Sequence, residues 1–537
     1  MNTNKKDWFR VKGYPHIGLP LKPNDRVRVS NYVSDPNNIS RHSFLPFIHK
    51  TIQTRKFRKE YDKDGKLRHE GLRVESKKIR HIYYANHFDA NVYSFYSAIL
   101  SENYEKELSK LGLGRAISAY RRIPLIPNDA KSRNMCNIDF ANEVFEFIRN
   151  NKEEKLIAIA FDIKSFFDNL DHKILKEKWC DVLQVSKLPN DHYNVFRNIT
   201  KFSYVEEFDL FRKFKNEIIV ETKSGIRKSK KIDKIKYLKD QGAISYCEKN
   251  DFIQCKKRNK GFVKANKYTD NTKTELRIKG IPQGSPISSV LANIYLIDFD
   301  KEINKYISKN NGIYRRYSDD MVIVGNERLK DEIIDIFENE IKKCNLEIQQ
   351  SKTQIFHFIK TDNKYNCFNE TSSGLLIQTK KFEYLGFEFD GEFTMLKSGS
   401  LATYYRKLKR TLNRSVFYAK FTKDNTLKGE IFRKRLYKKF SYKGAERRRI
   451  YKMDKNNPGK WKLTHKFDWG NYLSYAYLAE NNMSNNKIGR QVKNHWKILN
   501  ELILKKEKIL NDKKVLLPTK NIGHLADSTK NENDSIK

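Results

Sequence analysis

The stretch Tyr314–Val324, YRRYSDDMVIV, places two adjacent carboxylates, Asp319 and Asp320, between two runs of strand-forming residues. Such runs on either side of a short polar segment predict two strands joined by a tight turn. Neighbouring aspartates at a turn repel one another, and a divalent cation that prefers oxygen ligands relieves this repulsion. A solvated Asp-Asp turn is the alternative, because aspartate favours turns through local hydrogen bonds.

Two segments upstream favour the metal-binding alternative. Leu156–Phe161 is an apolar run that predicts a buried strand, and Asp162 follows it directly. Gly280–Ser288, GIPQGSPIS, is rich in glycine and proline, which allow close backbone approach before the helix predicted over Ser289–Asp300. The chain therefore presents a strand ending in aspartate, a Gly-rich loop with a helix, and an Asp-Asp hairpin, in that order.

This order resembles the palm of the reverse transcriptases. Gln350–Thr353, which contains Lys352, and Phe382–Phe387 are similar to the next two motifs of that family, so the resemblance covers roughly residues 115–390. It implies an α/β (α+β) right-hand polymerase fold, with reverse transcriptase fingers and palm followed by an α-helical, basic thumb or C-terminal domain. The activity that it implies is that of an RNA-directed DNA polymerase, a nucleotidyltransferase.

The family's chemistry is an in-line phosphoryl displacement assisted by two metal ions. By resemblance, Asp162, Asp319 and Asp320 hold two Mg²⁺ ions, for which Mn²⁺ is a substitute, and the main-chain carbonyl of Ile163 joins the ligands. Lys352 resembles the lysine proposed to protonate the departing pyrophosphate. The alternative for Lys352 is a solvated charge, which is common in so basic a chain.

The resemblance also implies a nucleotide pocket and a primer grip. Phe167 stands where the family has a bulky side chain under the sugar of the incoming nucleotide, and such a side chain favours deoxynucleotides. The alternative for Phe167 is an ordinary core residue. Arg121 and Arg122 are similar to a basic fingers segment that holds triphosphate or template, and general backbone contacts are their alternative. The expected nucleotide-binding residues are therefore Phe167, Gln283, Gly284, Arg121 and Arg122, and the expected primer grip is Tyr384, Leu385 and Gly386.

Composition agrees with a polyanionic partner. The chain has 537 residues with 107 Lys and Arg against 65 Asp and Glu, a formal charge of +42. Its six cysteines lack metal-ligand spacing and follow no apolar leader, and the chain has no apolar run of the ~18 residues that span a membrane. We therefore expect reduced thiols, no zinc-dependent appendage, no membrane residence and a cytoplasmic location.

Four regions are expected along the chain. Residues 1–114 lead into the fingers, 115–400 form fingers and palm, 401–516 form the helical thumb-like domain, and 517–537 form a polar, disordered tail. A basic insertion at about 205–278 is interpretable as a flexible loop, a nucleic-acid clamp or a docking surface. Ile79–Leu108 and the chain from Trp461 to Lys514 are predicted to be helical.

Within the family, the chain most resembles the bacterial unknown-group and abortive-infection class linked to phage defence. This likeness is carried by Tyr120–Pro124, Phe140–Asn142, Phe161–Asp171 and Arg316–Asp320. Within that class, Lys12–His16 and Asn471–Tyr475 resemble the second polymerase of the type 3 defence systems. Retron and group II intron signatures are missing, though these types remain alternatives. The resemblance implies RNA or DNA and deoxynucleoside triphosphates as partners, with a non-coding RNA, a companion reverse transcriptase and a homo- or hetero-oligomer as further expectations.

The source of the template stays open at this point, because the class includes enzymes that work without a nucleic-acid template or that prime from a protein side chain. An RNA-dependent RNA polymerase and a catalytically idle nucleic-acid-binding scaffold are the rival functions. Phe167 argues against the first, because its ring excludes a 2′-hydroxyl. The retained aspartates argue against the second, because a pure binder gains affinity by losing negative charge beside phosphates.

Overall fold

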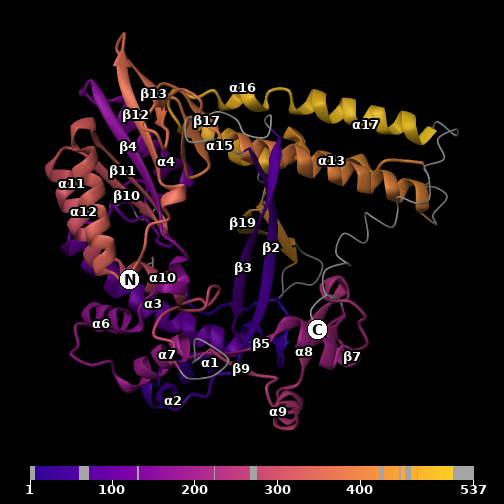
Figure 1. Ribbon diagram of the computed structural model, residues 1–537. Coiled ribbons are helices and arrows are strands. Elements are labelled where there is room, and N and C mark those ends of the chain that lie inside the picture. The colour runs from indigo at the N-terminus through magenta and orange to yellow at the C-terminus, as the bar shows by residue number, and fades with distance from the viewer. Residues whose placement is uncertain are drawn as a thin grey trace. The chain divides into compact units, whose positions relative to one another are not determined.

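In the computed structural model (Figure 1), the chain forms two compact units. It describes residues 7–59, 72–127, 129, 132–222, 224–266, 275–422, 429–446, 449–453, 461–467 and 470–511. The first unit spans residues 1–135 and 147–380, and the second spans 136–146 and 381–537. The boundary at residue 380 assigns Phe382–Phe387 to the second unit, whereas the sequence analysis included it with the palm.

A six-stranded sheet in the order β10-β11-β4-β12-β13-β14 forms the centre of the first unit. Its strands are β4 (Lys155–Asp162), β10 (Ile313–Tyr317), β11 (Asp320–Asn326), β12 (Gln354–Thr361), β13 (Lys364–Glu370) and β14 (Leu376–Ile377). All neighbouring pairs are antiparallel. Because β4 is paired on both sides, Leu156–Ile159 are buried, as their continuous apolar run predicts.

Helices pack around this sheet and form the main core of the first unit. They are α1 (Arg26–Val33), α2 (Pro36–Ser40), α3 (His87–Lys110), α5 (Phe166–Asn169), α6 (His172–Leu183), α7 (Asn190–Thr200), α10 (Ser288–Tyr295), α11 (Ile297–Lys309) and α12 (Lys330–Lys343). Phe161 of β4 stacks on Phe337 of α12 with ring centroids 3.7 Å apart, and Phe299 of α11 meets Phe337 edge-on. The predicted helix over Ser289–Asp300 is confirmed, but it divides into α10 and α11.

The helix predicted from Ile79 is wrong at its start. Residues Arg73–Tyr84 form β3, which pairs antiparallel with β2 (Phe47–Lys59), and helix α3 begins only at His87. The side chain of Asn86 accepts a hydrogen bond from the Phe88 N–H and caps the helix. Pairing with a distant strand overrides the local helical pattern over Ile79–Tyr84, and a local pattern does not reveal such a partner.

The basic insertion is a folded element in its described part, so a flexible loop no longer accounts for it. It contains β5 (Ser203–Glu206), α8 (Glu207–Phe214), β6 (Ile218–Glu221), β7 (Arg227–Lys230), β8 (Ala243–Cys247), α9 (Lys249–Arg258) and β9 (Lys264–Ala265). Strands β8, β6 and β7 of the insertion form one sheet with β1 (His16–Ile17) of the N-terminal region, in the order β1-β8-β6-β7. Leu210, Ile218, Tyr246 and Phe252 are buried in a core of their own.

The second unit combines a small sheet with helices. Its elements are the start of α4 (Asn137–Arg149), β15 (Phe382–Tyr384), β16 (Phe387–Phe389), β17 (Thr394–Leu396), α13 (Ser398–Phe421), α14 (Arg433–Phe440), β18 (Arg449–Met453), β19 (Trp461–Phe467), α15 (Tyr472–Asn482), α16 (Ile488–Val492) and α17 (His495–Asn511). Tyr404, Leu408 and Leu412 lie on the buried face of α13, as expected for an amphipathic helix.

The expected helix is wrong over Trp461–Phe467, because these residues pair with Arg449–Met453 as a two-stranded hairpin. The predicted disordered tail, residues 517–537, lies outside the described residues. In the part of the chain that the structure describes, no helix combines the length and the apolar character needed to cross a bilayer.

Candidate active site

Two of the expected catalytic aspartates lie side by side on neighbouring strands of the central sheet. Asp162 ends β4 and Asp320 begins β11, and the two are direct partners in the antiparallel register of these strands. Directly opposed residues have Cβ atoms about 5 Å apart, so both carboxylates stand on one face at one end of the strand pair. Ser318 and Asp319 form the two-residue turn that joins β10 to β11, and Tyr317 and Asp320 on either side of it are cross-strand partners. The predicted hairpin is therefore confirmed.

The turn before Asp320 has a left-handed backbone at Ser318, with φ of 63°. Serine rarely adopts this conformation, so surrounding contacts must hold it. The Ser318 hydroxyl lies 3.1 Å from the hydroxyl of Tyr120, and the Ser318 carbonyl accepts a 3.4 Å hydrogen bond from Arg316. Tyr120 also has a positive φ, 65°. One contact from within the hairpin, Arg316, and one from outside it, Tyr120, thus hold the backbone that orients Asp319.

Arg316 belongs to a buried polar network under this turn. Its guanidinium donates to both carboxylate oxygens of Asp300, at 2.7 and 2.6 Å, and both side chains are fully enclosed. It also donates to the side chain of Asn293, which in turn donates to the Ala119 carbonyl. Burial raises the pKa of Asp300, and the adjacent guanidinium opposes this shift. Tyr314 donates to the same carboxylate at 2.7 Å.

The sequence analysis did not identify Arg316 or Asp300 as site residues. Asp300 repeats with the buried Ile297, Ile303 and Ile307 at the helical spacing of α11, so it is a carboxylate on an apolar face. Buried carboxylates are paired with a cation in nearly all proteins. The spacing of Asp300 was therefore an available signal of a buried partner, although it does not indicate which cation.

The backbone of Ile163, an expected metal ligand, is oriented by a bridge to Ile348. Ile163 forms an antiparallel bridge with Ile348, in which the Gln349 N–H donates to the Asp162 carbonyl and the Lys164 N–H donates to the Glu347 carbonyl. In this pattern the backbone groups of Ile163 itself point away from Ile348. The strand on that side of β4 is β11, which begins with Asp320. The Ile163 carbonyl is therefore directed toward the side of the sheet that carries the Asp-Asp turn.

Lys352 lies at the same end of the sheet. Its ammonium is 2.6 Å from the Asp162 carboxylate, and the lysine side chain is 45% exposed. It sits in a short 3-10 turn, Gln350–Lys352, immediately before β12. The structure thus brings Lys352 to Asp162, although the two residues are 190 positions apart in the chain.

Two backbone hydrogen bonds join the Gly-rich loop to the segment that follows Asp162. The Ile281 N–H donates to the Phe167 carbonyl at 2.9 Å, and the Gly280 N–H donates to the Leu170 carbonyl at 2.8 Å. Gly280 has φ of 95°, and a Cβ there would lie 2.8 Å from the Asp168 carbonyl oxygen, so only glycine fits. Phe167 is half-buried, with its ring tilted against that of Phe166 at 5.6 Å.

Gln283 and Gly284 lie against the N-terminal β3. The Tyr83 N–H donates to the Gln283 carbonyl at 2.8 Å. At Gly284, φ is 117° and a Cβ would lie 2.7 Å from the Tyr83 carbonyl oxygen, so the close approach of the two backbones requires glycine. Tyr83 thus contributes to the wall of the expected nucleotide pocket, and it was not predicted because Ile79–Tyr84, the last part of β3, was expected to be helical.

Charged and aromatic side chains gather beside Phe167 and the root of β3. Burial raises the pKa of Asp168, while the nearby His81 and Arg277 lower it. His49 stacks on His81 and Tyr83 with centroids 5.1 and 4.7 Å apart. Its imidazole connects Glu206, 2.7 Å from Nδ1, to the His81 ring, 2.9 Å from Nε2.

Arg121 and Arg122 differ in their surroundings. The guanidinium of Arg121 is bound by both oxygens of Glu105, at 2.8 and 2.6 Å, and donates to the carbonyls of Gly114 and Ile117. Its side chain is only 7% exposed. Arg121 is thus engaged within the protein, whereas Arg122 is exposed and is the arginine of this pair with a free approach from solvent.

The expected primer-grip residues form a tight hairpin in the second unit. Tyr384 and Phe387 are partners at the ends of β15 and β16, with Leu385 and Gly386 between them. Both turn residues have positive φ, 46° and 94°, as in a type I′ turn. A leucine in this conformation costs on the order of 1–2 kcal/mol, which singles out Leu385 as a strained residue at an element tip.

The carboxylates suit a hard divalent cation. Asp162 and Asp320 provide oxygen donors from adjacent strands, and the Lys352 ammonium beside Asp162 shows that this position accommodates a positive charge. The described residues contain no group of three or more His, Cys, Asp or Glu side chains close enough to hold one ion. An ion bound here therefore needs oxygen ligands from the backbone, substrate or water as well, as Mg²⁺ commonly does.

Residues 243–389 match the family described as reverse transcriptase (RNA-dependent DNA polymerase). The chain carries a reverse transcriptase domain. The matched residues include the Gly-rich loop and the Asp-Asp hairpin, and the three-dimensional structure adds Asp162, which lies outside them. The fold class is thus the α/β right-hand polymerase, and the enzyme class of the domain is RNA-directed DNA polymerase. A comparison with curated proteins finds no match.

Among solved structures, the chain is similar to yeast telomerases. One is apo telomerase from Candida tropicalis truncated from the C-terminal domain, at 12% identity and a TM-score of 0.32, with 69% of this chain and 59% of that chain covered. Another is Candida albicans telomerase in complex with a TWJ fragment of telomeric RNA, at 13% identity and a TM-score of 0.35, with 95% and 68% covered. The chain thus spans about three fifths of the first of these telomerases.

Proposed function

We propose that this protein adds deoxynucleotides to a primer 3′-hydroxyl, with RNA as the template, as a reverse transcriptase does. The observation that carries the proposal is the direct cross-strand pairing of Asp162 with Asp320, which lies within the residues that match this family. A nucleic-acid-binding scaffold has no use for carboxylates at this position, because they repel phosphates.

Asp162, Asp319 and Asp320, with the Ile163 carbonyl, are the groups that would hold two Mg²⁺ ions, and Mn²⁺ would substitute. Bound there, the ions would lower the pKa of the primer hydroxyl and neutralise the charge that develops on the triphosphate. The buried Arg316–Asp300 pair keeps the Ser318 backbone, and with it Asp319, in one orientation. Lys352, whose ammonium lies 2.6 Å from Asp162, carries a proton that it can donate to the departing pyrophosphate.

Phe167 and Gln283 would select the incoming nucleotide. The Phe167 ring is half-buried and its backbone is fixed by Ile281, so it cannot withdraw easily from a 2′-hydroxyl. Gln283 and Gly284 would face the nucleotide from the Gly-rich loop, and the exposed Arg122 would contact triphosphate or template. Tyr384, Leu385 and Gly386 would hold the primer strand.

The biological setting that we propose is anti-phage defence in the bacterial cytoplasm. It rests on the likeness of Tyr120–Pro124, Phe140–Asn142 and Phe161–Asp171 to the defence-associated class. A non-coding RNA and a companion reverse transcriptase are the partners that this class implies. Synthesis without a nucleic-acid template is the variant of the reaction that the first experiment must distinguish.

The experiment supplies the full chain with Mg²⁺ and labelled deoxynucleotides, with and without an RNA template and DNA primer, and sequences the product. We expect a template-copied DNA that Asp319→Ala abolishes, with a loss of at least about 10³-fold, because the substitution removes a metal ligand. The matched control is Asp331→Ala, an exposed aspartate at the start of α12.

Three results would contradict the proposal. A polymer made from ribonucleotides would identify an RNA polymerase. A defined DNA product without any template, after nuclease treatment of the protein, would replace RNA templating by untemplated synthesis. A chain that binds nucleic acid but makes no product with or without Asp319 would be a scaffold.

A further inference from the structure

The β2–β3 ribbon, defined as Lys50–Lys59 paired with Arg73–Ile82, extends beyond the sheet to which it belongs. That sheet has the order β3-β2-β5-β9, but β5 pairs only with Phe47–His49 of β2. From Lys50 onward the described strands are paired only with each other. Ten residues of strand span about 30 Å. In Figure 1 the ribbon is the long indigo pair labelled β2 and β3.

Both faces of this ribbon are exposed to solvent over residues 51–55 and 77–81, whose side chains are described. Residues 51–55 of β2 and 77–81 of β3 are all exposed, including apolar Ile52 at 43% and Ile79 at 54%. Successive residues of a strand point to opposite faces, so exposure of a continuous run means that neither face is covered. A two-stranded ribbon is only marginally stable in water on its own. A ribbon of this length therefore suits a bound partner better than a free state.

Among the exposed described side chains of the ribbon, the charged ones are mainly basic. Arg55, Lys77, Lys78 and Arg80 carry four positive charges, and Glu75 carries one negative charge. Arg55 and Lys77 are direct cross-strand partners, a like-charged arrangement that is unfavourable unless an anion lies nearby. Within the ribbon, Glu75 lies 3.4 Å from Arg55 and offsets part of this repulsion.

The root of the ribbon adjoins the candidate active site. Tyr83, the partner of His49 at the base of the ribbon, donates its N–H to the Gln283 carbonyl, and Gly284 touches the Tyr83 carbonyl. Nucleic acid that reaches the Gly-rich loop therefore passes the base of the ribbon. At 3.4 Å per base step, 30 Å of ribbon spans about nine steps of one strand.

We propose that the β2–β3 ribbon is a nucleic-acid-binding arm that follows the phosphates of the template–primer. This inference rests on the proposed function for the choice of nucleic acid, and on the ribbon's own exposure and charge for the binding. Its contacts are to phosphates, so they add affinity without sequence preference. The arm lies outside the motifs by which the reverse transcriptase domain is defined and outside residues 243–389.

The test measures binding of the full chain to a fluorescent RNA–DNA template–primer by anisotropy, without nucleotides, from 50 to 200 mM KCl. The variant Lys77→Thr/Lys78→Thr/Arg80→Thr removes three charges and keeps strand-forming residues. Each lost phosphate contact lowers the salt slope by about 0.7–0.9. Lys78 and Arg80 share one face of the ribbon and Lys77 lies on the other, so one bound nucleic acid loses about two contacts. We expect a slope reduced by about 1.5 and affinity at 100 mM KCl reduced on the order of tenfold or more.

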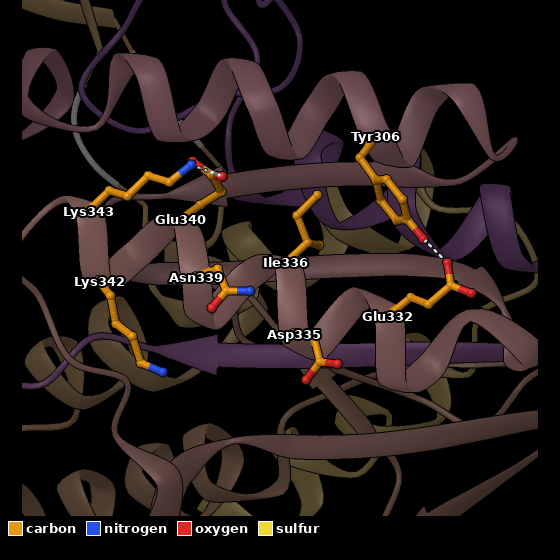
Figure 2. A pocket seen from close by; sticks show the side chains of 8 residues that line it. All are labelled: Tyr306, Glu332, Asp335, Ile336, Asn339, Glu340, Lys342 and Lys343. Atoms are coloured by element: carbon orange, nitrogen blue, oxygen red, sulfur yellow. Dashed lines mark hydrogen bonds and ion pairs between the residues drawn. The ribbon is translucent and has the colours of Figure 1, made fainter.

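The matched control removes three charges from another face of the same unit, by Lys309→Gln/Lys342→Gln/Lys343→Gln. Lys342 and Lys343 line a shallow hollow of about 880 Å³ between α11 and α12, shown in Figure 2. Glu332, Asp335 and Glu340 line the same hollow, so this face repels phosphates despite its lysines. We expect this control to bind within about twofold of the unmodified chain.

A second variant acts in the opposite direction. Glu75→Gln removes the only acidic side chain among the exposed described residues of the ribbon and releases Arg55 from its ion pair. We expect its affinity for the template–primer to rise about threefold or more. A gain of affinity is not produced by misfolding, so this variant keeps the test decisive if the triple variant is unstable.

The measurement uses a blunt duplex and a duplex with a 5′ template overhang. Loss of affinity on both supports contact with the duplex, and loss only with the overhang supports contact with the single-stranded template. A triple variant that binds like its control overturns the proposal. So does a result in which the ribbon variant abolishes self-association of the chain but leaves nucleic-acid affinity unchanged, because the ribbon would then be a protein interface. These binding measurements do not require DNA synthesis. They therefore test the arm even if the protein proves not to be a polymerase.

Discussion

The guanidinium of Arg316 and the carboxylate of Asp300 form a bidentate ion pair that is completely enclosed beneath the turn carrying Asp319. Arg316 uses a further N–H to bind the carbonyl of Ser318, the residue before Asp319. The pair therefore links the packing of α11 to the position of Asp319, which we propose to be a metal ligand. A charge buried in this way is tolerable only while its partner is present.

Removal of one partner should destabilise the protein strongly. Arg316→Met leaves the Asp300 carboxylate buried without its cation, and we expect a loss of about 3–5 kcal/mol in the free energy of unfolding. The double variant Asp300→Leu/Arg316→Met should be more stable than either single variant, because it leaves no unpaired charge. Urea denaturation measures both. The exposed pair Arg26–Asp7 is the control, and Arg26→Met should cost no more than about 1 kcal/mol. A loss below that value for Arg316→Met would contradict the role of the pair.

Lys352 should affect turnover and metal requirement in different directions. Lys352→Ala removes a proton donor, and we expect kcat to fall on the order of 10²-fold. The same change removes the cation beside Asp162, so half-maximal synthesis should need less Mg²⁺ than in the unmodified chain. Single-turnover extension across a Mg²⁺ titration gives both quantities. Lys164→Ala is the control, because that exposed lysine pairs with Glu347 near the same strand. Unchanged kcat would leave Lys352 as a mere counter-charge.

Phe167 should determine the choice of sugar. Phe167→Ala opens the space occupied by the ring, and we expect the ratio of kcat/KM for deoxynucleotide over ribonucleotide to fall on the order of 10²-fold. Competing incorporation of matched nucleotide pairs measures this ratio. Phe166→Leu is the control, because Phe166 is buried in the core and its truncation should affect stability and leave the ratio unchanged. An unaltered ratio in Phe167→Ala would mean that this residue serves packing alone.

His16 should make the protein sensitive to acid. Its Nε2 lies 3.1 Å from the Tyr84 carbonyl while Nδ1 accepts from the Ile17 N–H, and burial lowers its pKa from 6.5 to about 3. Between pH 6.5 and about 3 the unfolded chain binds a proton that the folded chain does not, so stability falls as the pH falls. At pH 5 the loss is about 2 kcal/mol for this residue. Urea denaturation at pH 7 and pH 5 should show a smaller difference for His16→Gln than for the unmodified chain.

Local sequence patterns predicted the elements that carry the chemistry. The hydrophobic run before Asp162 became β4, and the YSDD segment became the turn between β10 and β11. These predictions succeed because hydrophobic periodicity and turn chemistry act over a few residues. The same local reasoning failed at Ile79–Tyr84 and Trp461–Phe467, where pairing with another strand decided the structure.

The sequence by itself determined which residue types are present and where each strand, turn and glycine-dependent loop is formed. Only the tertiary structure decided that Asp162 meets Asp320, that Lys352 reaches Asp162, and that Arg121 is held by Glu105. It also disclosed the Asp300–Arg316 pair and the contact of Tyr83 with Gln283. The physical reason is that strand register and buried ion pairs join residues far apart in the chain, and their energies depend on burial that no local pattern specifies.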